Sequence, residues 1–283
     1  MKVSIVTPFF NSSKHIEATA KSVLAQSHQN WEWIIVDDGS DPDEWQALEM
    51  LATADSRIHI KERVTNKQKG ACACRNTGLA AATGDYVIFL DSDDLLAPQC
   101  VSERIRAVRE RNLGDKEILY FPTIGSTKES PEQVYWDDPQ NSGEWLECIL
   151  SLTPACQSSG PFWPTETIKE IGGWNESMMV WQDLEVHARA GIEGIRFISV
   201  STHEPDLYYQ MRSESLSHQN FHSSEKTQSR YIFLQYVIES FSELNAKAKD
   251  ASFVILFSVF KALVLAKRWK DAKKIIRLLD GRI

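Results

Sequence analysis

The stretch DYVIFLDSDD, residues 85–94, decides which fold we predict for this sequence. Its apolar run, residues 86–90, has the length and the β-branched and aromatic composition of a buried strand, so the acidic cluster should lie at the carboxyl end of that strand. Open α/β sheets bind their ligands at this edge. Asp91 and Asp93 share a face on a regular strand, where two carboxylates repel each other unless a cation lies between them. Such oxygen ligands suit Mg²⁺ or Mn²⁺ carrying a phosphorylated substrate.

The same cluster has a purely structural alternative. Because Asp is favoured at helix N-caps, residues 91–94 also fit a solvated strand-to-helix turn in which Asp94 caps the next helix. Taken alone, the ten residues favour the two interpretations about equally.

Strands and helices alternate through the first half of the chain. Apolar runs predict strands over 3–10, 31–36, 58–60 and 86–90. Helical spacing predicts a helix capped by Ser12 or Ser13 with Ile16, Ala20, Val23 and Leu24 on one face, and others through 45–51, over 70–82 with an interruption at Gly78, and from Pro98 through 108. This order predicts an α/β fold, a Rossmann-like and mainly parallel sheet flanked by helices.

Two of these strands end in acids. Asp37 and Asp38 follow the strand over 31–36, and Asp91 and Asp93 follow the strand over 86–90. Because parallel strands present their carboxyl ends at one edge of the sheet, both clusters should line the same crevice. Two unrelated caps or turns would not require this coincidence, so the pair favours a ligand site.

Composition narrows the class of protein. The chain has 283 residues, of which 42% are hydrophobic, so it can bury a large core. Five cysteines without zinc spacing indicate reduced thiols rather than disulfides. The start, MKVSIVTPFF, has no signal-peptide pattern, which predicts a cytoplasmic protein. A net charge of -8 argues against a nucleic-acid partner.

Four motifs, in this order, resemble the family-2 glycosyltransferases of the GT-A fold: TPFFN (7–11), VDDGSD (36–41), ACRNTGLAAATGDYVIFLDSDD (73–94) and GGWNESMMVWQDLEVHARA (172–190). The resemblance implies a GT-A catalytic domain over 1–217. Its nucleotide-sugar half would cover about 1–97 and its acceptor half about 98–217. A C-terminal helical segment would follow over 218–283.

The resemblance also implies roles for the residues that contact the donor. Pro8 and Phe10 match positions that line the nucleotide base, although Phe10 also fits an ordinary core position. Asp38 matches the acid that hydrogen-bonds the uracil. Lys69 and Arg75 lie where the family offers basic or small residues to the nucleotide, and Arg75 fits a structural pair with an Asp equally well.

For the metal, the resemblance implies that Asp93 is the direct ligand on the diphosphate and that Asp91 is the acid of the ribose and metal shell. Asp94 fits a helix cap better than a ligand. His203, after a predicted strand over 195–200, is a further expected metal or phosphate contact.

The resemblance places the catalytic base at Asp183. The family's usual Glu-Asp pair stands here as Gln182-Asp183, which removes one negative charge beside the base. Such a base needs a partly desolvated carboxylate beside the donor to deprotonate an acceptor hydroxyl. The structural alternative is that Asp183 is an acid of the first helical turn, favoured by the helix dipole. If Asp183 were not the base, Glu185 or Glu176 would be the next candidate.

Aromatic residues in the second half fit either sugar stacking or packing. Trp174 follows the Gly172-Gly173 turn, while Trp136, Trp145 and Trp163 lie in the region expected to bind the acceptor. The segment YYQMRSESLS (208–217), with Arg212, is similar to a family stretch that closes over the donor.

The C-terminal segment is helical by pattern, with apolar spacing over 231–244 and 252–265 and a basic run over 267–277 that begins near Trp269. The apolar part is too short to span a bilayer. A helical hairpin packed on the catalytic domain is the first interpretation. A peripheral membrane contact, made by an apolar face flanked by Lys and Arg, is the second.

The sequence therefore predicts a metal-dependent, inverting hexosyltransferase for polysaccharide biosynthesis, with Mn²⁺ or Mg²⁺ as cofactor. It would move a sugar from a nucleotide diphosphate donor, UDP-linked, to a hydroxyl of a glycan or lipid-linked acceptor. One rival is a degenerate nucleotide-sugar binder without turnover. Another is a phosphatase, whose DxD motif is matched less well because Leu95 follows Asp94.

Overall fold

The computed structural model describes residues 1–64, 68–114, 116–121, 123–126, 134–135, 145–153, 156–200, 206–210 and 223–280. Its central sheet has seven strands in the order β10-β6-β9-β4-β1-β2-β3. These are β1 (Val3–Phe9), β2 (Trp31–Asp37), β3 (Ile58–Glu62), β4 (Tyr86–Phe89), β6 (Glu117–Tyr120), β9 (Pro161–Pro164) and β10 (Arg196–Ser199). Strand β9 runs antiparallel to β4 and β6, and all other pairs are parallel.

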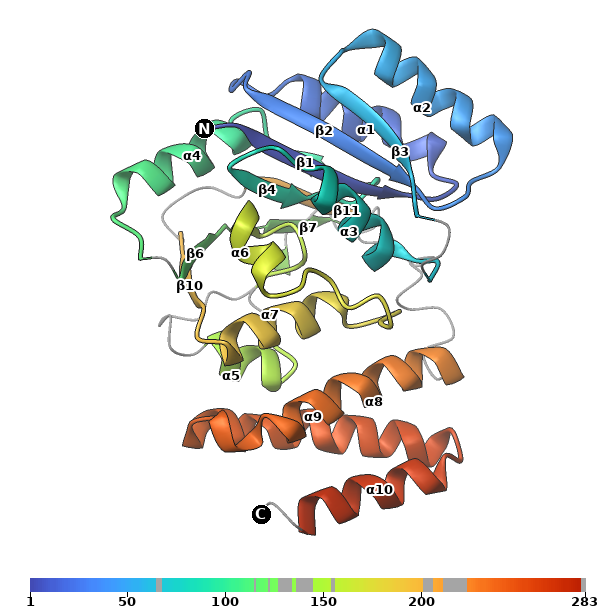
Figure 1. Ribbon diagram of the computed structural model, residues 1–283, viewed down its shortest axis with the longest axis vertical. Helices are drawn as coiled ribbons and strands as arrows, with labels where there is room; N and C mark the ends of the chain where they lie inside the picture. The colour runs from blue at the N-terminus through green and yellow to red at the C-terminus, as the bar shows by residue number, and fades with distance from the viewer. Residues whose placement is uncertain are drawn as a thin grey trace.

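Helices cover both faces of this sheet (Figure 1). They are α1 (Ser13–Leu24), α2 (Pro42–Ala54), α3 (Ala71–Ala81), α4 (Cys100–Glu110), α5 (Trp145–Leu150), α6 (Thr165–Glu170) and α7 (Gln182–Ile192). A second sheet of four strands has the order β5-β11-β7-β8 and consists of β5 (Leu95–Leu96), β7 (Thr123–Ser126), β8 (Val134–Tyr135) and β11 (Leu207–Gln210). The predicted mainly parallel α/β fold is confirmed.

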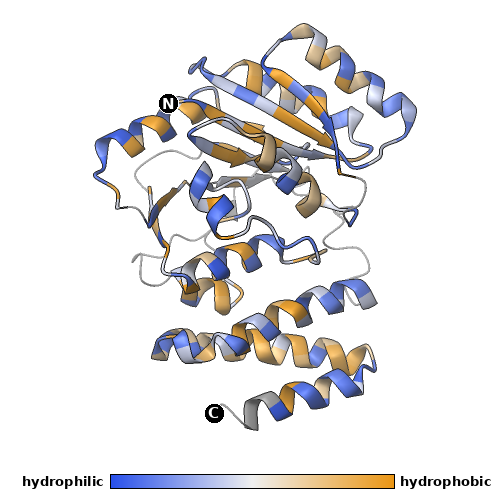
Figure 2. Cartoon of the chain, in the orientation of Figure 1, coloured by the Kyte–Doolittle hydropathy of each residue, from blue (hydrophilic) through white to orange (hydrophobic). Residues whose placement is uncertain are grey.

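Successive side chains of a strand point to opposite faces of the sheet, and here both sets are apolar, which explains why helices cover both faces. Ile5 and Trp33 join one buried cluster with side chains of α1 and α4, while their neighbours Val6 and Ile34 join a second cluster with side chains of α3 and α7. Strands apolar on both faces are typical of a parallel sheet buried between helix layers. Figure 2 shows the strands of the sheet centre as predominantly hydrophobic.

Helix α3 runs without the predicted interruption at Gly78. A Cβ at this glycine would collide with Val6 Cγ1, so Gly78 lets the helix approach β1 closely. Leu24, in the last turn of α1, is 38% exposed. One further prediction was wrong: Asp94 leads into β5 rather than capping a helix, since α4 begins at Cys100 after Gln99.

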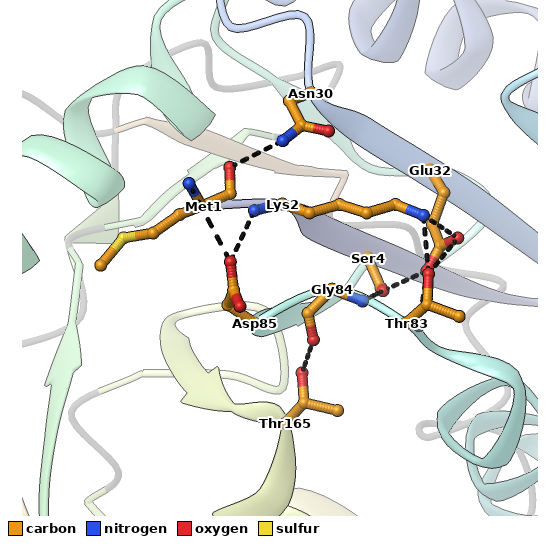
Figure 3. Close-up of polar contacts among 9 residues, drawn as sticks. All are labelled: Met1, Lys2, Ser4, Asn30, Glu32, Thr83, Gly84, Asp85 and Thr165. Atoms are coloured by element: carbon orange, nitrogen blue, oxygen red, sulfur yellow. Dashed lines mark hydrogen bonds and ion pairs between the residues drawn. The ribbon is translucent and has the colours of Figure 1, made fainter.

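The amino-terminal edge of the sheet is tied together by a buried carboxylate, Glu32 of β2 (Figure 3). It accepts hydrogen bonds from Lys2 Nζ (2.7 Å), Ser4 Oγ (2.6 Å) and the Thr83 backbone N–H (2.7 Å). Lys2 and Ser4 lie in or next to β1 and Thr83 precedes β4, so Glu32 links all three central strands. The ends that carry the expected site lie at the opposite edge.

Three helices follow the α/β part: α8 (Ser224–Glu239), α9 (Ala246–Leu265) and α10 (Trp269–Asp280), with a 3-10 turn, η1 (Phe241–Glu243). Figure 1 shows them stacked at the end of the molecule opposite α2. Helix α9 contacts α5, α8 and α10, and Phe233, Val259 and Trp145 belong to one buried cluster. A packed helical arrangement is therefore present. Among the described residues, no helix is both long and apolar enough to cross a membrane.

Candidate functional site

The two acidic strand ends flank the end of β1. In the register of the sheet, Phe9 of β1 pairs with Asp37 of β2, and on the other side the Leu90 backbone N–H, just after β4, donates to the Val6 carbonyl at 2.9 Å. The segment after Phe9 therefore lies between the acids of β2 and those of β4. This is the crevice that the alternation of strands and helices predicts.

The neighbouring acids Asp37 and Asp38 bind different partners. Asp37 accepts hydrogen bonds from the backbone N–H groups of Gly39 (2.9 Å) and Ser40 (3.1 Å), which builds the turn after β2. Gly39 has φ +82°, a conformation that favours glycine. Asp38 forms an ion pair with Arg63 Nε at 2.5 Å, just after β3. Asp38, the expected uracil contact, is thus already held in place.

The expected base-lining residues stand beside this pair. Pro8 is half-buried, and Phe10 is 43% exposed. Lys69 Nζ lies 3.8 Å from the centre of the Phe10 ring, a cation–π contact. Phe10 is therefore not a core residue, and its ring and the Lys69 ammonium are both near solvent at the crevice.

Arg75 of α3 connects the acids of β4 to helix α7. Arg75 is 4% exposed, its Nη2 donates to Asp91 Oδ1 at 2.6 Å, and its Nη1 donates to Gln182 Oε1 at 2.7 Å. The guanidinium carbon lies 4.5 Å from the centre of the Trp174 ring. Of the two interpretations of Arg75, the structure shows the pair with an Asp.

Asp91 and Asp93 are both half-buried at the end of β4. Tyr209 of β11, which sequence analysis did not single out, lies beside them because β11 pairs with β5. Burial and, in smaller part, the charges of Asp94, Asp91, Asp93 and Asp183 together raise the pKa of Tyr209 to about 12. All four carboxylates therefore lie near enough to this phenol to act on its charge.

Asp183 lies in the first turn of α7, where the chain enters the helix from Trp181 in a left-handed conformation (φ 59°). Asp183 Oδ1 accepts from the Leu184 backbone N–H at 3.0 Å. Burial raises the pKa of Asp183, the Leu184 N–H and the Arg75 charge lower it, and the Asp91 charge raises it again. A carboxylate in a desolvated site near other acids has the properties of a general base.

The turn before α7 is held by α3 and by α7 itself. Asn76 donates to the Trp174 carbonyl and to Glu176 Oε1, both at 2.8 Å, and accepts from the Trp174 N–H. Arg189 of α7 pairs with Glu185 (2.9 Å) and donates to the Gly173 carbonyl at 2.6 Å. Glu185 and Glu176 thus have structural partners, which favours Asp183 over both as the base.

The three described tryptophans for which sugar stacking was considered, Trp145, Trp163 and Trp174, are structural. Trp174 is buried, and its ring contacts the Phe89 ring edge to face, with 5.0 Å between ring centres. It therefore anchors the turn and is not exposed to stack on a sugar. Trp145 and Trp163 are buried in the core. Trp136, His203 and Arg212 lie outside the described residues, so the roles expected for them stay predictions.

A divalent metal fits the donor set at the end of β4. Asp91 and Asp93 offer hard carboxylate oxygens, although within the described ranges no three His, Cys, Asp or Glu side chains gather as a ligand cluster. Mg²⁺ commonly binds one or two carboxylates, with the remaining positions taken by substrate phosphates and water. The residues present suit a metal that arrives with a diphosphate.

A hollow of about 480 Å³ lies next to Arg63, on the side of α2 and β3. Its lining includes Trp45 and Glu62 but none of the acids of β4 or α7. It is therefore beside the expected nucleotide site and does not include Asp91 or Asp183.

Comparison with known proteins agrees with this geometry. Residues 4–117 match the family model "Glycosyl transferase family 2". WfgD of Escherichia coli, a UDP-Glc:alpha-D-GlcNAc-diphosphoundecaprenol beta-1,3-glucosyltransferase, is 34% identical over 140 residues, which are 48% of this chain and 53% of WfgD. WfaP of E. coli, with the same named activity, is 40% identical over 103 residues, 36% of this chain and 39% of WfaP. The chain thus matches about half or less of the length of these relatives.

A solved structure extends the likeness to most of the chain. The S. aureus protein TarS, crystallised with UDP, superimposes with a TM-score of 0.66 and 18% identity, covering 90% of this chain and 71% of that chain. At this identity the likeness concerns the fold. The expected GT-A fold is confirmed.

Proposed function

Because residues 4–117 of this chain match the family model of glycosyl transferase family 2, we propose that it transfers a sugar from a UDP-linked donor to a hydroxyl of a glycan or a lipid-linked precursor. The named activity of WfgD and WfaP supports a UDP donor and a diphosphoundecaprenol acceptor, and TarS was crystallised with UDP. One observation carries the proposal: Arg75 links Asp91, at the end of β4, to Gln182, which directly precedes Asp183.

The residues of the crevice would share the work as follows. Pro8, Phe10 and Asp38 would bind the uracil base of the nucleotide. Lys69 would face the nucleotide, and Asp91 and Asp93 would hold the metal. Asp183 would accept the proton of the acceptor hydroxyl while its oxygen attacks the anomeric carbon. The bond from that carbon to the diphosphate oxygen breaks, and UDP leaves with the electron pair. A single displacement of this kind inverts the anomeric configuration.

When bound, Mn²⁺ or Mg²⁺ would supply positive charge to the leaving diphosphate. The protein's own contribution is to hold the metal-binding acids, Asp91 and Asp93, and the catalytic base, Asp183, at separate positions. A carboxylate that coordinates the metal directly would lose its basicity. Arg75, placed between Asp91 and Gln182, provides this separation.

We also propose a cytoplasmic location. The cysteines support it: all five are free, four of them are buried, and free thiols are typical of a reducing compartment.

The test is a thermal-shift screen of UDP, GDP and their sugars, with and without Mn²⁺. A ligand at 100 times its dissociation constant stabilises a protein by about 2.7 kcal/mol. We expect Mn²⁺-dependent stabilisation by UDP and UDP-sugars, lost in Asp93→Asn and kept in Asp43→Asn, which changes an exposed acid of α2. Mn²⁺-dependent UDP binding that survives in Asp93→Asn would remove Asp93 from the metal site.

A second candidate, a nucleotide-sugar binder without turnover, is favoured by one observation: Gln182 stands where the family usually has Glu. The two candidates differ in UDP release. With a UDP-sugar and a lipid-linked acceptor, the transferase releases UDP continuously, whereas the binder is stabilised by the donor and releases none.

A further inference from the structure

Helix α9 presents an apolar face to solvent. Val254, Phe257, Lys261 and Leu265 are exposed and recur every three or four residues, so they lie on one side of the helix. Phe257 is 69% exposed. The opposite side of the helix, with Val259 among others, belongs to the buried core. Core packing therefore does not explain why this outer side is apolar.

Helix α10 continues the pattern. Trp269, which is 57% exposed, and Ile276 are seven residues apart and share a face, while Ala272 and Ile275 between them are buried. Exposed Lys273 lies on the same face as Trp269. Helices α9 and α10 contact each other and lie at the same end of the molecule (Figure 1). Both carry exposed apolar side chains.

This end of the molecule is also basic. Between residues 261 and 277 there are seven Lys or Arg residues and one acid, Asp271, in a chain whose net charge is -8. Asp271 is held by Arg268 Nη2 at 2.6 Å. Within the described part of the chain, Lys261, Lys270 and Lys273 form no ion pair. The positive charge is thus concentrated in one segment and available to a partner.

The positive charge and the exposed apolar side chains of this surface indicate what kind of partner it binds. A second copy bound through the same face would place two strongly basic segments against each other, which is unfavourable. An anionic lipid bilayer offers negative headgroups for the lysines and an apolar layer for Phe257, Trp269 and Ile276, and Trp is enriched at membrane interfaces. We propose that the outer face of α9 and α10 docks onto anionic membrane surfaces.

The proposal is independent of the donor chemistry, since it concerns helices that follow the sugar-transfer site. No spanning helix is needed, because an interfacial helix buries its apolar side chains only to the depth of the headgroup boundary.

The experiment measures how much of the full chain floats with vesicles of phosphatidylglycerol and phosphatidylcholine, compared with phosphatidylcholine alone. We expect binding only to the anionic vesicles, weaker at higher salt. Each basic residue near an anionic surface contributes roughly fivefold to the affinity. Lys270→Glu with Lys273→Glu should therefore weaken binding by about 25-fold or more. Phe257→Ser with Trp269→Ser should also reduce it strongly.

Matched variants elsewhere control for charge and exposed apolar area. Lys14→Glu with Lys61→Glu makes the same change in net charge on α1 and β3, and Met50→Ser removes another side chain that is 69% exposed. Both should bind vesicles as the wild type does. Thermal unfolding and UDP-induced stabilisation, measured on every variant, show that the fold and the donor site are intact.

Three results would overturn the proposal: no flotation with anionic vesicles at low salt, equal flotation of the tail variants and the wild type, or concentration-dependent self-association that Phe257→Ser and Trp269→Ser abolish in the absence of vesicle binding. The last result would assign the face to a second copy. None of them bears on UDP binding, so the proposed transferase stands or falls separately.

Discussion

Arg75 Nη2 donates to Asp91 Oδ1 at 2.6 Å while the Arg75 guanidinium is buried over the Trp174 ring. Asp91 itself is 31% exposed at its side chain, so one end of this ion pair faces the core and the other faces the crevice. Through its second nitrogen the same guanidinium holds Gln182 at the start of α7. One side chain therefore sets the position of the β4 acids relative to the helix that carries Asp183.

Replacing Arg75 by Lys tests this arrangement. A lysine keeps the charge, but a single ammonium cannot reproduce the planar fork that reaches both Asp91 and Gln182. We expect transfer to fall by on the order of 10²-fold, as for a displacement of about 1 Å at a reacting centre. The measurement is kcat under saturating donor and acceptor.

The matched control is Arg57→Lys, which breaks an Arg fork on Asp55, near the start of β3 and away from the crevice. Arg57→Lys should leave kcat within about twofold of the wild type, because its fork holds no residue of α7. If both lysine variants lose the same activity, or neither loses any, Arg75 has no special positioning role.

Glu32 predicts how the fold responds to acid. Although burial raises the pKa of this carboxyl, hydrogen bonds from Lys2, Ser4 and Thr83 lower it, and the result is a pKa of about 2. A carboxyl with a lowered pKa stabilises the fold fully above its unfolded pKa, near 4.5, and this contribution is lost as the pH falls toward 2. The contribution is about 3 kcal/mol.

We therefore expect Glu32→Gln to lower the free energy of unfolding at pH 7 and to flatten its dependence on pH between 4.5 and 2. Urea titrations at a series of pH values measure both effects. Glu17→Gln is the control, because Glu17 pairs with Lys21 on the exposed face of α1. A wild-type pH dependence in Glu32→Gln would mean that another group governs acid unfolding.

Gln182 gives a prediction for the pH dependence of transfer. A glutamate at this position adds a negative charge next to Asp183 and raises the pKa of Asp183 further, because like charges disfavour ionisation. The base must be deprotonated to act, so the acid limb of the kcat profile in Gln182→Glu should move to higher pH. Gln46→Glu, on the exposed side of α2, should not move it. A limb that stays or moves to lower pH contradicts the placement of Asp183 as the titrating base.

Local patterns in the sequence predict the order of strands and helices along the first half of the chain well, because apolar runs and turn residues are short-range signals. The shared edge of Asp38 and Asp91 follows from that order alone. The pairing of Asp38 with Arg63, and of Arg75 with Gln182, joins residues 25 and 107 positions apart, and no spacing rule connects them. Tyr209 was missed for the same reason, since its neighbours come from β4 and α7.

Gly78 and Asp94 show where a correct local rule gives a wrong result. Glycine disfavours helix interiors, but here the missing Cβ permits the contact of α3 with Val6. Asp favours N-caps, but residues 95–96 pair with β11 and so delay the helix to Cys100. In both cases tertiary contacts outweigh the local preference.

Asp183→Asn tests the mechanism most directly. Asn is nearly isosteric and its side-chain oxygen can still accept from the Leu184 N–H, but it cannot take a proton from the acceptor. Removing a general base costs ~10²–10⁴-fold in rate. We expect this loss in kcat with unchanged affinity for UDP and Mn²⁺, which separates proton abstraction from binding.

The same variant should be more stable than the wild type at neutral pH. Burial raises the pKa of Asp183, so the fold favours the protonated acid, and the stability associated with that proton is lost as the pH rises through the raised pKa. Asn has no charge to bury, so the melting temperature of Asp183→Asn should exceed that of the wild type at pH 7 and 8. The difference should vanish below the ordinary Asp pKa. A variant that transfers sugar at the wild-type rate, or that melts lower at pH 8, would make Asp183 a structural acid of the first turn of α7.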